Sequence, residues 1–327
     1  MTRFIIKRLA SMVLVLFAVS VITFLIFNVI PNGDPAVRMA GKQPTETQVE
    51  AIRKEWGFDE PIWTQYATTM KNLFSGKMVS YFTQLNVLQE IWKGVPRTFA
   101  LAIGAAILWM VFAIALGLWS AMRAGGVSDN LLNVFALIGI SMPVFWLGAL
   151  MNQYLGYELS NLLGFDLFPN GGYVEFTVSP FEWFHHLILP WVALSVLFVG
   201  FYSRILRANI LETLDEDYVR TARAKGLPER QIMIKHVLRT SLISVVTLWG
   251  LDFAVVVGGG AILTETVFNL QGVGQYAAEA IAQLDQPPIM AVTMLGAFFV
   301  VFFNTLVDIV YAWLDPRIRL EAGDTAP

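Results

Sequence analysis

The sequence predicts an all-α polytopic membrane protein with six transmembrane helices. Hydrophobic residues make up 56% of the 327 residues and charged residues only 14%, a composition typical of chains that reside in a bilayer. Five apolar runs are long enough to cross a hydrocarbon core of about 30 Å, and a sixth, of 17 residues, is at the short end of the range for a membrane span. Between the fourth and fifth runs lies a long polar insert, residues 204–240, as expected of a cytoplasmic loop.

The first apolar run, residues 9–30, has no charged residue and follows Arg3, Lys7 and Arg8. A secretory signal would have a shorter apolar region and a small-residue cleavage site, so we expect an uncleaved first span. The other predicted spans are residues 98–122, 131–155, 186–202, 242–263 and 289–314.

The distribution of lysine and arginine predicts cytoplasmic termini. The two shorter outer loops, residues 157–184 and 265–288, contain neither residue, whereas the insert 204–240 contains many. The outer segment 31–97 also contains both, but it is long enough to be translocated whatever its charge. The predicted organisation is a tail and first span (1–30), an extracytoplasmic segment (31–97), a five-helix core (98–320) and a tail (321–327).

The outer segment is predicted to contain short helices. Thr45 and Gln48 fit a capping box that opens a helix, Gly57 is suited to end that helix, and Pro61 to start the next. A structured outer segment can contact an external partner, or it can be a lid that packs only on the bundle.

The polar insert contains a stretch that predicts two short helices joined by a turn, residues 215–228. Acidic residues start the stretch and basic residues end its first helix, which complements a helix dipole. Gly226 suits the position after the last turn, and Pro228 the first turn of a second helix. Val219 and Ala222 present a face with little bulk, which would allow close docking on another protein. The alternative is a basic amphipathic helix on anionic lipid.

Residues 218–227, YVRTARAKGL, resemble the signature cytoplasmic loop of binding-protein-dependent ABC importer permeases of the dipeptide/oligopeptide family. The wider family has Glu-Ala-Ala, three residues and Gly at positions 220–222 and 226, so Arg220 replaces its glutamate. The resemblance implies a coupling helix that docks on a separate ATP-binding subunit. The residues that it assigns to this coupling are Tyr218, Arg220, Thr221, Ala222, Arg223 and Gly226.

Other segments extend the resemblance over essentially the whole chain. They are VPRT at 95–98, SMPVFWLG at 141–148, TETVF at 264–268, GVG at 272–274 and LDPR at 314–317. Gln271 departs from the family, which commonly has proline at that position.

Motifs for catalysis are absent from the sequence. Neither Gly-Lys pair is followed by Ser or Thr, so no phosphate-binding loop for ATP is present. The zinc-protease motif HExxH and the serine-hydrolase motif GxSxG are also absent. His185 and His186 are adjacent and cannot share a helix face, so we expect no metal site and no cofactor.

Three features within the spans are candidates for the translocation path or a gate. Asp252 is a carboxylate at membrane depth, which either lines a path, carries a proton or ties two helices together. The triple glycine Gly258, Gly259 and Gly260 allows close helix packing or a hinge. Pro143 must disturb the third span.

These observations predict a non-catalytic permease subunit of a bacterial or archaeal ABC importer in the cytoplasmic membrane. The resemblance implies peptide cargo, two ATP-binding subunits, a second permease chain and an extracytoplasmic substrate-binding protein. Membrane lipid surrounds such a chain, and we expect no nucleic-acid partner. The alternative is a secondary transporter that uses Asp252 for proton coupling.

Overall fold

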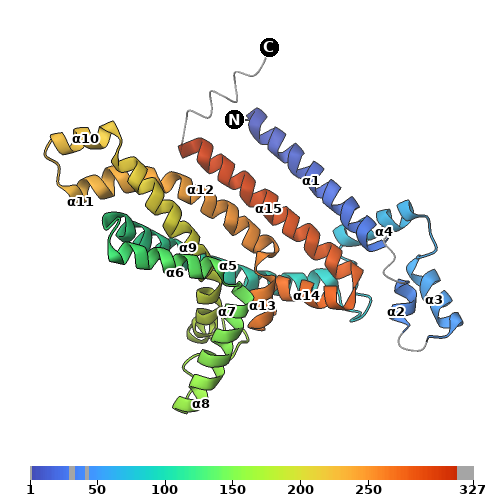
Figure 1. The fold of residues 1–327 in the computed structure, drawn as a ribbon. Coiled ribbons are helices and arrows are strands. Elements are labelled where there is room, and N and C mark those ends of the chain that lie inside the picture. Colours follow the sequence, from blue (N-terminus) through green and yellow to red (C-terminus); the bar gives the residue numbers. More distant parts are fainter. Residues whose placement is uncertain (1, 29–33, 41–43, 315–327) are drawn as a thin grey trace.

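The computed structural model describes residues 2–28, 34–40 and 44–314, which fold into a bundle of helices (Figure 1). Within these residues, five helices are long and apolar enough to cross a membrane, or six if one bent pair counts as a single span. The predicted six spans correspond to the second count. The five stretches are Arg8–Phe27, Val87–Met122, Pro180–Leu214, Glu229–Gly260 and Gln286–Ile309, and the bent pair is Val127–Ser141 with Val144–Leu163.

The first and last spans lie side by side. Helix α1 covers Thr2–Asn28 and α15 covers Gln286–Leu314. Their free ends lie at the end of the bundle that also bears α10, Asp217–Ala224 (Figure 1). The last two residues of the first predicted span, the LDPR segment beyond residue 314 and the tail 321–327 lie outside the described residues.

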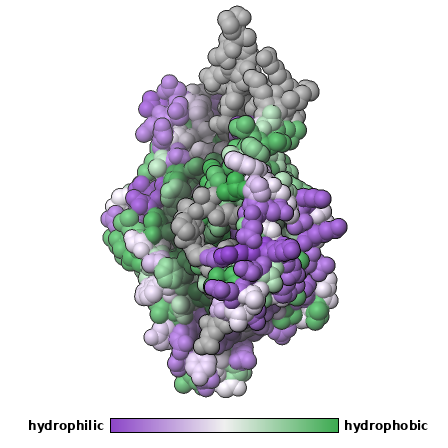
Figure 2. Space-filling view, turned by 90° about the vertical axis from the view of Figure 1, so that its right-hand side faces the viewer, coloured by the Kyte–Doolittle hydropathy of each residue, from purple (hydrophilic) through white to green (hydrophobic). Residues whose placement is uncertain are grey.

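The outer segment forms three short helices at the opposite end of the bundle, where hydrophilic side chains gather (Figures 1 and 2). The capping box is confirmed, because Thr45 and Gln48 exchange both bonds and Gly57 ends the helix at φ 71°. Pro61 precedes the next helix directly, as predicted. The helices are α2 (Pro35–Met39), α3 (Glu46–Trp56) and α4 (Ile62–Phe74).

Helix α5, Val87–Met122, begins eleven positions before the predicted start at residue 98, so that start was wrong. The Asn86 side chain caps it by accepting a bond from the N–H of Gln89 at 3.0 Å. The extra turns carry polar residues on their exposed side, while Val87 and Ile91 pack in a small core under the outer segment. Hydropathy alone does not reveal turns that are buried by protein rather than by lipid.

The third predicted span is bent by 97°. Helix α6, Val127–Ser141, ends before Pro143, which has extended backbone dihedrals and precedes α7, Val144–Met151. A proline lacks the N–H that would continue the helix. The expected disturbance at Pro143 is therefore confirmed, and the chain continues through the π-helical η1, Asn152–Glu158, and α8, Leu159–Leu163.

The main core lies between α5 and α9. Helix α9 covers Pro180–Leu214 and is twice as long as the predicted span 186–202, because it begins at the Ser179 cap and continues through residues 203–214 beyond the apolar run. Trp109 and Tyr202 are fully buried in this core. The remaining elements are α11 (Glu229–Ile232), η2 (Met233–Leu238), α12 (Arg239–Val255), η3 (Val256–Gly260), α13 (Ile262–Val267) and α14 (Val273–Gln283).

Candidate functional site

Residues 215–228, here called the knuckle, form the tip of the molecule at the end of α9 (Figure 1). Helix α10 ends at Ala224, and Gly226 follows in the left-handed region at φ 75°. The Gly226 N–H donates to the Arg223 carbonyl at 2.9 Å. Pro228 lies directly before α11 rather than in its first turn as predicted. The turn therefore depends on a residue without a Cβ atom.

The face of α10 that carries Val219 and Ala222 packs against other parts of the same chain. Val219 is fully buried and Ala222 is 7% exposed, and both belong to the main core. Fully buried Ile232 of α11 belongs to the same core. The expectation that this face docks on another protein is therefore wrong. Burial also argues against a helix on the lipid surface, since such a helix inserts its apolar face among lipids.

The opposite face of α10 is exposed and basic. Arg220 and Thr221 are exposed on it, with Arg220 3.3 Å from Asp217. Arg223 is also exposed and lies 2.8 Å from Glu229 of α11. Tyr218 is 41% exposed, at the edge of this face. A partner protein can reach these side chains without disturbing the core.

Polar contacts join α9, which precedes the knuckle, to α12, which follows it after α11 and η2. Asn209 of α9 donates to the Ser244 hydroxyl of α12 at 2.7 Å. The hydroxyls of Thr213 and Ser241 lie 3.1 Å apart and are both buried. These bonds therefore hold together the helices on either side of the knuckle.

A buried ion pair braces α9 near the knuckle. Arg207 donates twice to the Asp129 carboxylate at 2.7 Å, and Asp129 is only 1% exposed. The Ser120 hydroxyl and the Gly125 N–H also bind this carboxylate. Sequence reasoning missed this site, although an aspartate in the first turn of α6 is a signal for one.

Asp252 ties two helices together. Its carboxylate accepts a 2.5 Å hydrogen bond from the hydroxyl of Tyr202, which is fully buried on α9. Of the three roles open to Asp252, this contact matches the tie between neighbouring helices.

The triple glycine provides both close packing and a break. Gly259 has φ 135° inside η3, a conformation that L side chains rarely adopt. Gly258 faces α15, where a Cβ atom added to Gly296 would lie 2.3 Å from the Gly258 carbonyl oxygen. The two helices therefore touch backbone to backbone. We call residues 258–260 the break.

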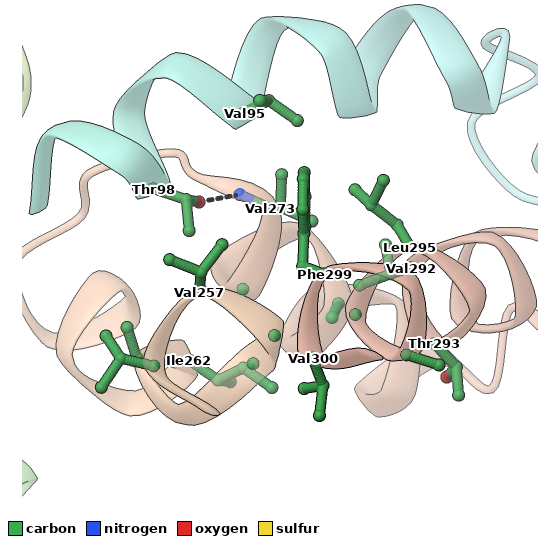
Figure 3. Close-up of a pocket in the computed structure, with 18 of the residues that line it drawn as sticks. Val95, Thr98, Val257, Ile262, Val273, Val292, Thr293, Leu295, Phe299 and Val300 are labelled. Atoms are coloured by element: carbon green, nitrogen blue, oxygen red, sulfur yellow. Dashed lines mark hydrogen bonds between the residues drawn. The ribbon is translucent and has the colours of Figure 1, made fainter. Parts of the chain in front are cut away.

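A cavity of about 380 Å³ adjoins the break. Its wall is mainly apolar and comes from α5, η3, α13, α14 and α15, as Figure 3 shows with Val95, Val257 and Phe299. Gly258 and Gly259 of the break line this cavity, and Gly258 also contacts α15. The residues of the knuckle do not line this cavity. Pro143 does not line it either.

Glu265 forms a buried clamp that sequence reasoning missed. The carboxylate is fully buried and accepts bonds from the Thr98 hydroxyl at 2.7 Å and the Gln275 N–H at 2.9 Å. Thr98 in turn accepts from the Val273 N–H (Figure 3). A Cβ atom on Gly272 would lie 2.3 Å from the carboxylate. The clamp thus ties α13 and α14 to α5 and explains the glycine in the GVG segment.

Burial raises the pKa of Glu265, while bonds from Thr98 and the backbone of Gln275 and Gly274 oppose that rise. We expect Glu265→Gln to lower the free energy of unfolding by about 1.5–3 kcal/mol, because an amide N–H replaces an acceptor that faces donors. Thermal unfolding of the purified chain measures this loss. Glu50→Gln, an exposed carboxylate on α3, is the control. Equal melting temperatures for both variants would contradict the clamp.

The backbone conformation at Gln271 explains why this position does not carry the proline that is common in the family. Its φ of 54° is closed to proline, whose ring holds φ near −65°. Arg97 donates to the Gln271 carbonyl at 3.2 Å and to its side chain at 2.9 Å. Arg97 also contacts Glu175 at 3.2 Å, so it joins two outer loops.

Comparisons with known proteins cover nearly the whole chain. Residues 113–320 match the family described as "Binding-protein-dependent transport system inner membrane component", and residues 1–102 match its N-terminal counterpart. A probable peptide ABC transporter permease of Sinorhizobium fredii is 37% identical over 97% of this chain and 99% of its own length. A dipeptide transport system permease of Alkalihalophilus pseudofirmus is 36% identical over 96% and 98%.

A probable D,D-dipeptide transport system permease of Escherichia coli is 36% identical over 97% of this chain and 98% of its own length. Among solved structures, the inward-facing MetNI methionine ABC transporter has a TM-score of 0.55 at 18% identity. That similarity covers 70% of this chain and 97% of the other, and at this identity it concerns the fold.

Proposed function

The chain belongs to the family of inner-membrane components of binding-protein-dependent transport systems, and from this premise we propose that it imports peptides. It is a multi-pass ABC permease, and permeases of this family are non-catalytic membrane subunits. The peptide and dipeptide names of relatives that match over nearly their full length support the cargo. Proton coupling through Asp252 receives no support, since its carboxylate binds Tyr202.

The knuckle is the part of the chain that we assign to contact with an ATP-binding subunit. Its exposed basic face holds Arg220, Thr221 and Arg223, which we assign to docking on an ATP-binding subunit, with Tyr218 at the edge. Ala222 supports this face from inside the core. ATP-driven closure would then move the knuckle together with α9 and α12, which changes the relative stability of inward-open and outward-open states.

The family works with an ATPase and an extracytoplasmic binding protein. We further assign two ATPase subunits and a second, similar permease chain to the complex, because a cargo path needs walls from both halves. The distribution of lysine and arginine supports cytoplasmic termini, with the knuckle on the cytoplasmic side. The break and its cavity are our candidates for the gate of the path.

Affinity purification and transport assays test this function. We expect the tagged chain in mild detergent to co-purify with ATPase subunits and a second permease, as identified by mass spectrometry. Reconstituted into liposomes with its binding protein, the complex should take up labelled dipeptide only with ATP. Arg220→Glu should weaken ATPase recovery, whereas Arg53→Glu, a basic residue of the outer segment, should not. Uptake by the isolated chain under a proton gradient would contradict the proposal.

A further inference from the structure

The outer segment contains a groove of about 290 Å³, here called the outer groove. Tyr81 lines it and makes edge-to-face contacts with Trp56 and Phe58, at centroid distances of 5.0 and 5.5 Å. Pro287, in the first turn of α15, forms another part of the wall. The wall of the outer groove therefore comes from both the outer segment and the start of the last span.

Asp285 joins these two parts. It lies directly before α15, is 2% exposed and accepts a 2.5 Å bond from the hydroxyl of Ser80, which is fully buried. Its second oxygen accepts from the Tyr81 N–H at 3.0 Å, and the backbone of Phe82 also donates to this carboxylate. The residue that lines the groove is thus bound through its backbone to the start of the last span.

The connection continues along α15 to the break. The small core below the outer segment is separate from the main core and contains Leu73 of α4 and Ala291 of α15. Further along α15, Gly296 touches the backbone of Gly258. No side chain separates the two helices at this crossing, so a shift of α15 must displace η3. The adjacent Gly259, at φ 135°, is the backbone position able to change conformation.

We propose that Asp285 is a positioning residue that transmits engagement of the outer groove by the extracytoplasmic binding protein to the break at Gly259. The identity of this partner rests on the proposed function. Most residues that line the outer groove belong to α3, α4 and the loops that follow them. These helices lie at the end of the molecule opposite the knuckle, which in the proposed orientation is the end that faces the binding protein (Figure 1). In this proposal the break has two conformations, and the outer groove and the ATPase side both bias the equilibrium between them.

The test measures the break directly. Hydrogen exchange of the backbone amides at 256–261 is compared for the unmodified chain and Asp285→Asn in the full complex in lipid nanodiscs. Asparagine offers one acceptor atom to three donors and adds donors of its own. We expect exchange at the break to rise about tenfold, the effect of losing hydrogen bonds to a charged acceptor. Asp59→Asn, an exposed carboxylate of the outer segment, should leave it unchanged.

Ser80→Ala removes one donor and should raise exchange at the break by a smaller factor than Asp285→Asn. Both variants should keep basal ATP hydrolysis within about twofold, because the knuckle is untouched, but lose stimulation by the binding protein. Unchanged exchange at 256–261 in Asp285→Asn would overturn the inference. Equal losses of basal and stimulated hydrolysis would also overturn it, because they indicate a merely structural residue.

Hydrogen exchange of the backbone amides at the break can be measured without any transport. The measurement therefore tests the inference separately from the proposed function. If the unmodified complex showed no stimulation by any binding protein, the proposed function would fail. Faster exchange in Asp285→Asn would still establish the link between the outer segment and the break.

Discussion

Replacing Gly226 with valine should reduce ATP-dependent peptide uptake at least about tenfold while the chain still enters the membrane. Gly226 has φ 75°, which costs a β-branched residue about 1–2 kcal/mol or more. No atom lies within 4 Å of an added Cβ atom, so the penalty comes from the backbone and not from a clash. The turn between α10 and α11 should relax to another conformation and displace Arg220 and Thr221.

Uptake by reconstituted liposomes, with ATP hydrolysis measured in parallel, checks this result. Gly164 provides a matched control, because it ends α8 at the same φ of 75° and also has open space around an added Cβ atom. Gly164→Val should therefore suffer the same backbone strain at a helix end distant from the knuckle. If both variants lost uptake equally, general destabilisation would explain the effect and the knuckle would have no special role.

Replacing Gly296 with alanine should separate α15 from η3 and cause the larger loss of stability among the glycine variants of this crossing. An added Cβ atom would lie 2.3 Å from the Gly258 carbonyl oxygen, a backbone atom that cannot rotate away. Overpacking of this kind costs about 1–3 kcal/mol, occasionally more. Because the break is built on the same crossing, uptake should fall together with the melting temperature.

Gly258→Ala is the matched comparison. There the added Cβ atom meets Val300 Cγ2 at 2.4 Å, and a side-chain methyl group can move by a rotamer change. We expect a smaller drop in melting temperature than for Gly296→Ala, as measured by the unfolding of both variants in detergent. A Gly296→Ala chain as stable as the unmodified one would show that the two helices do not touch through their backbones.

Much of the fold could be predicted because its signals are local. Apolar runs predict which parts of a helix are covered by lipid. The capping residues Thr45 and Gly57 predict where a helix begins and ends. Pro143 interrupts a helix whatever its neighbours are.

Predictions failed where protein replaces lipid as the surrounding medium. The outer turns of α5 are covered by the outer segment, and the C-terminal end of α9 carries fully buried Leu206 and Ile210. The fifth span also begins earlier than predicted, at Glu229 and not at residue 242.

The candidate site was located by the sequence but not oriented by it. The spacing of Val219 and Ala222 correctly grouped them on one face, yet only α11 and the main core decide that this face is buried. Helical periodicity shows which residues share a face and does not show what the face meets. The sequence was therefore sufficient to find the knuckle, and the structure was needed to show that Arg220 and Thr221 are on its free side.

By itself, the sequence determined the class of protein, the approximate position of each span and the turn at Gly226, and it left open whether the triple glycine packs closely or breaks the helix. Each of these depends on bilayer thickness or on the backbone preferences of single residues. Only the tertiary structure decided the partners of Glu265, Asp285 and Asp252, and the contact of Gly258 with Gly296. These contacts join residues far apart in the chain, and folding alone brings them within hydrogen-bonding or van der Waals distance.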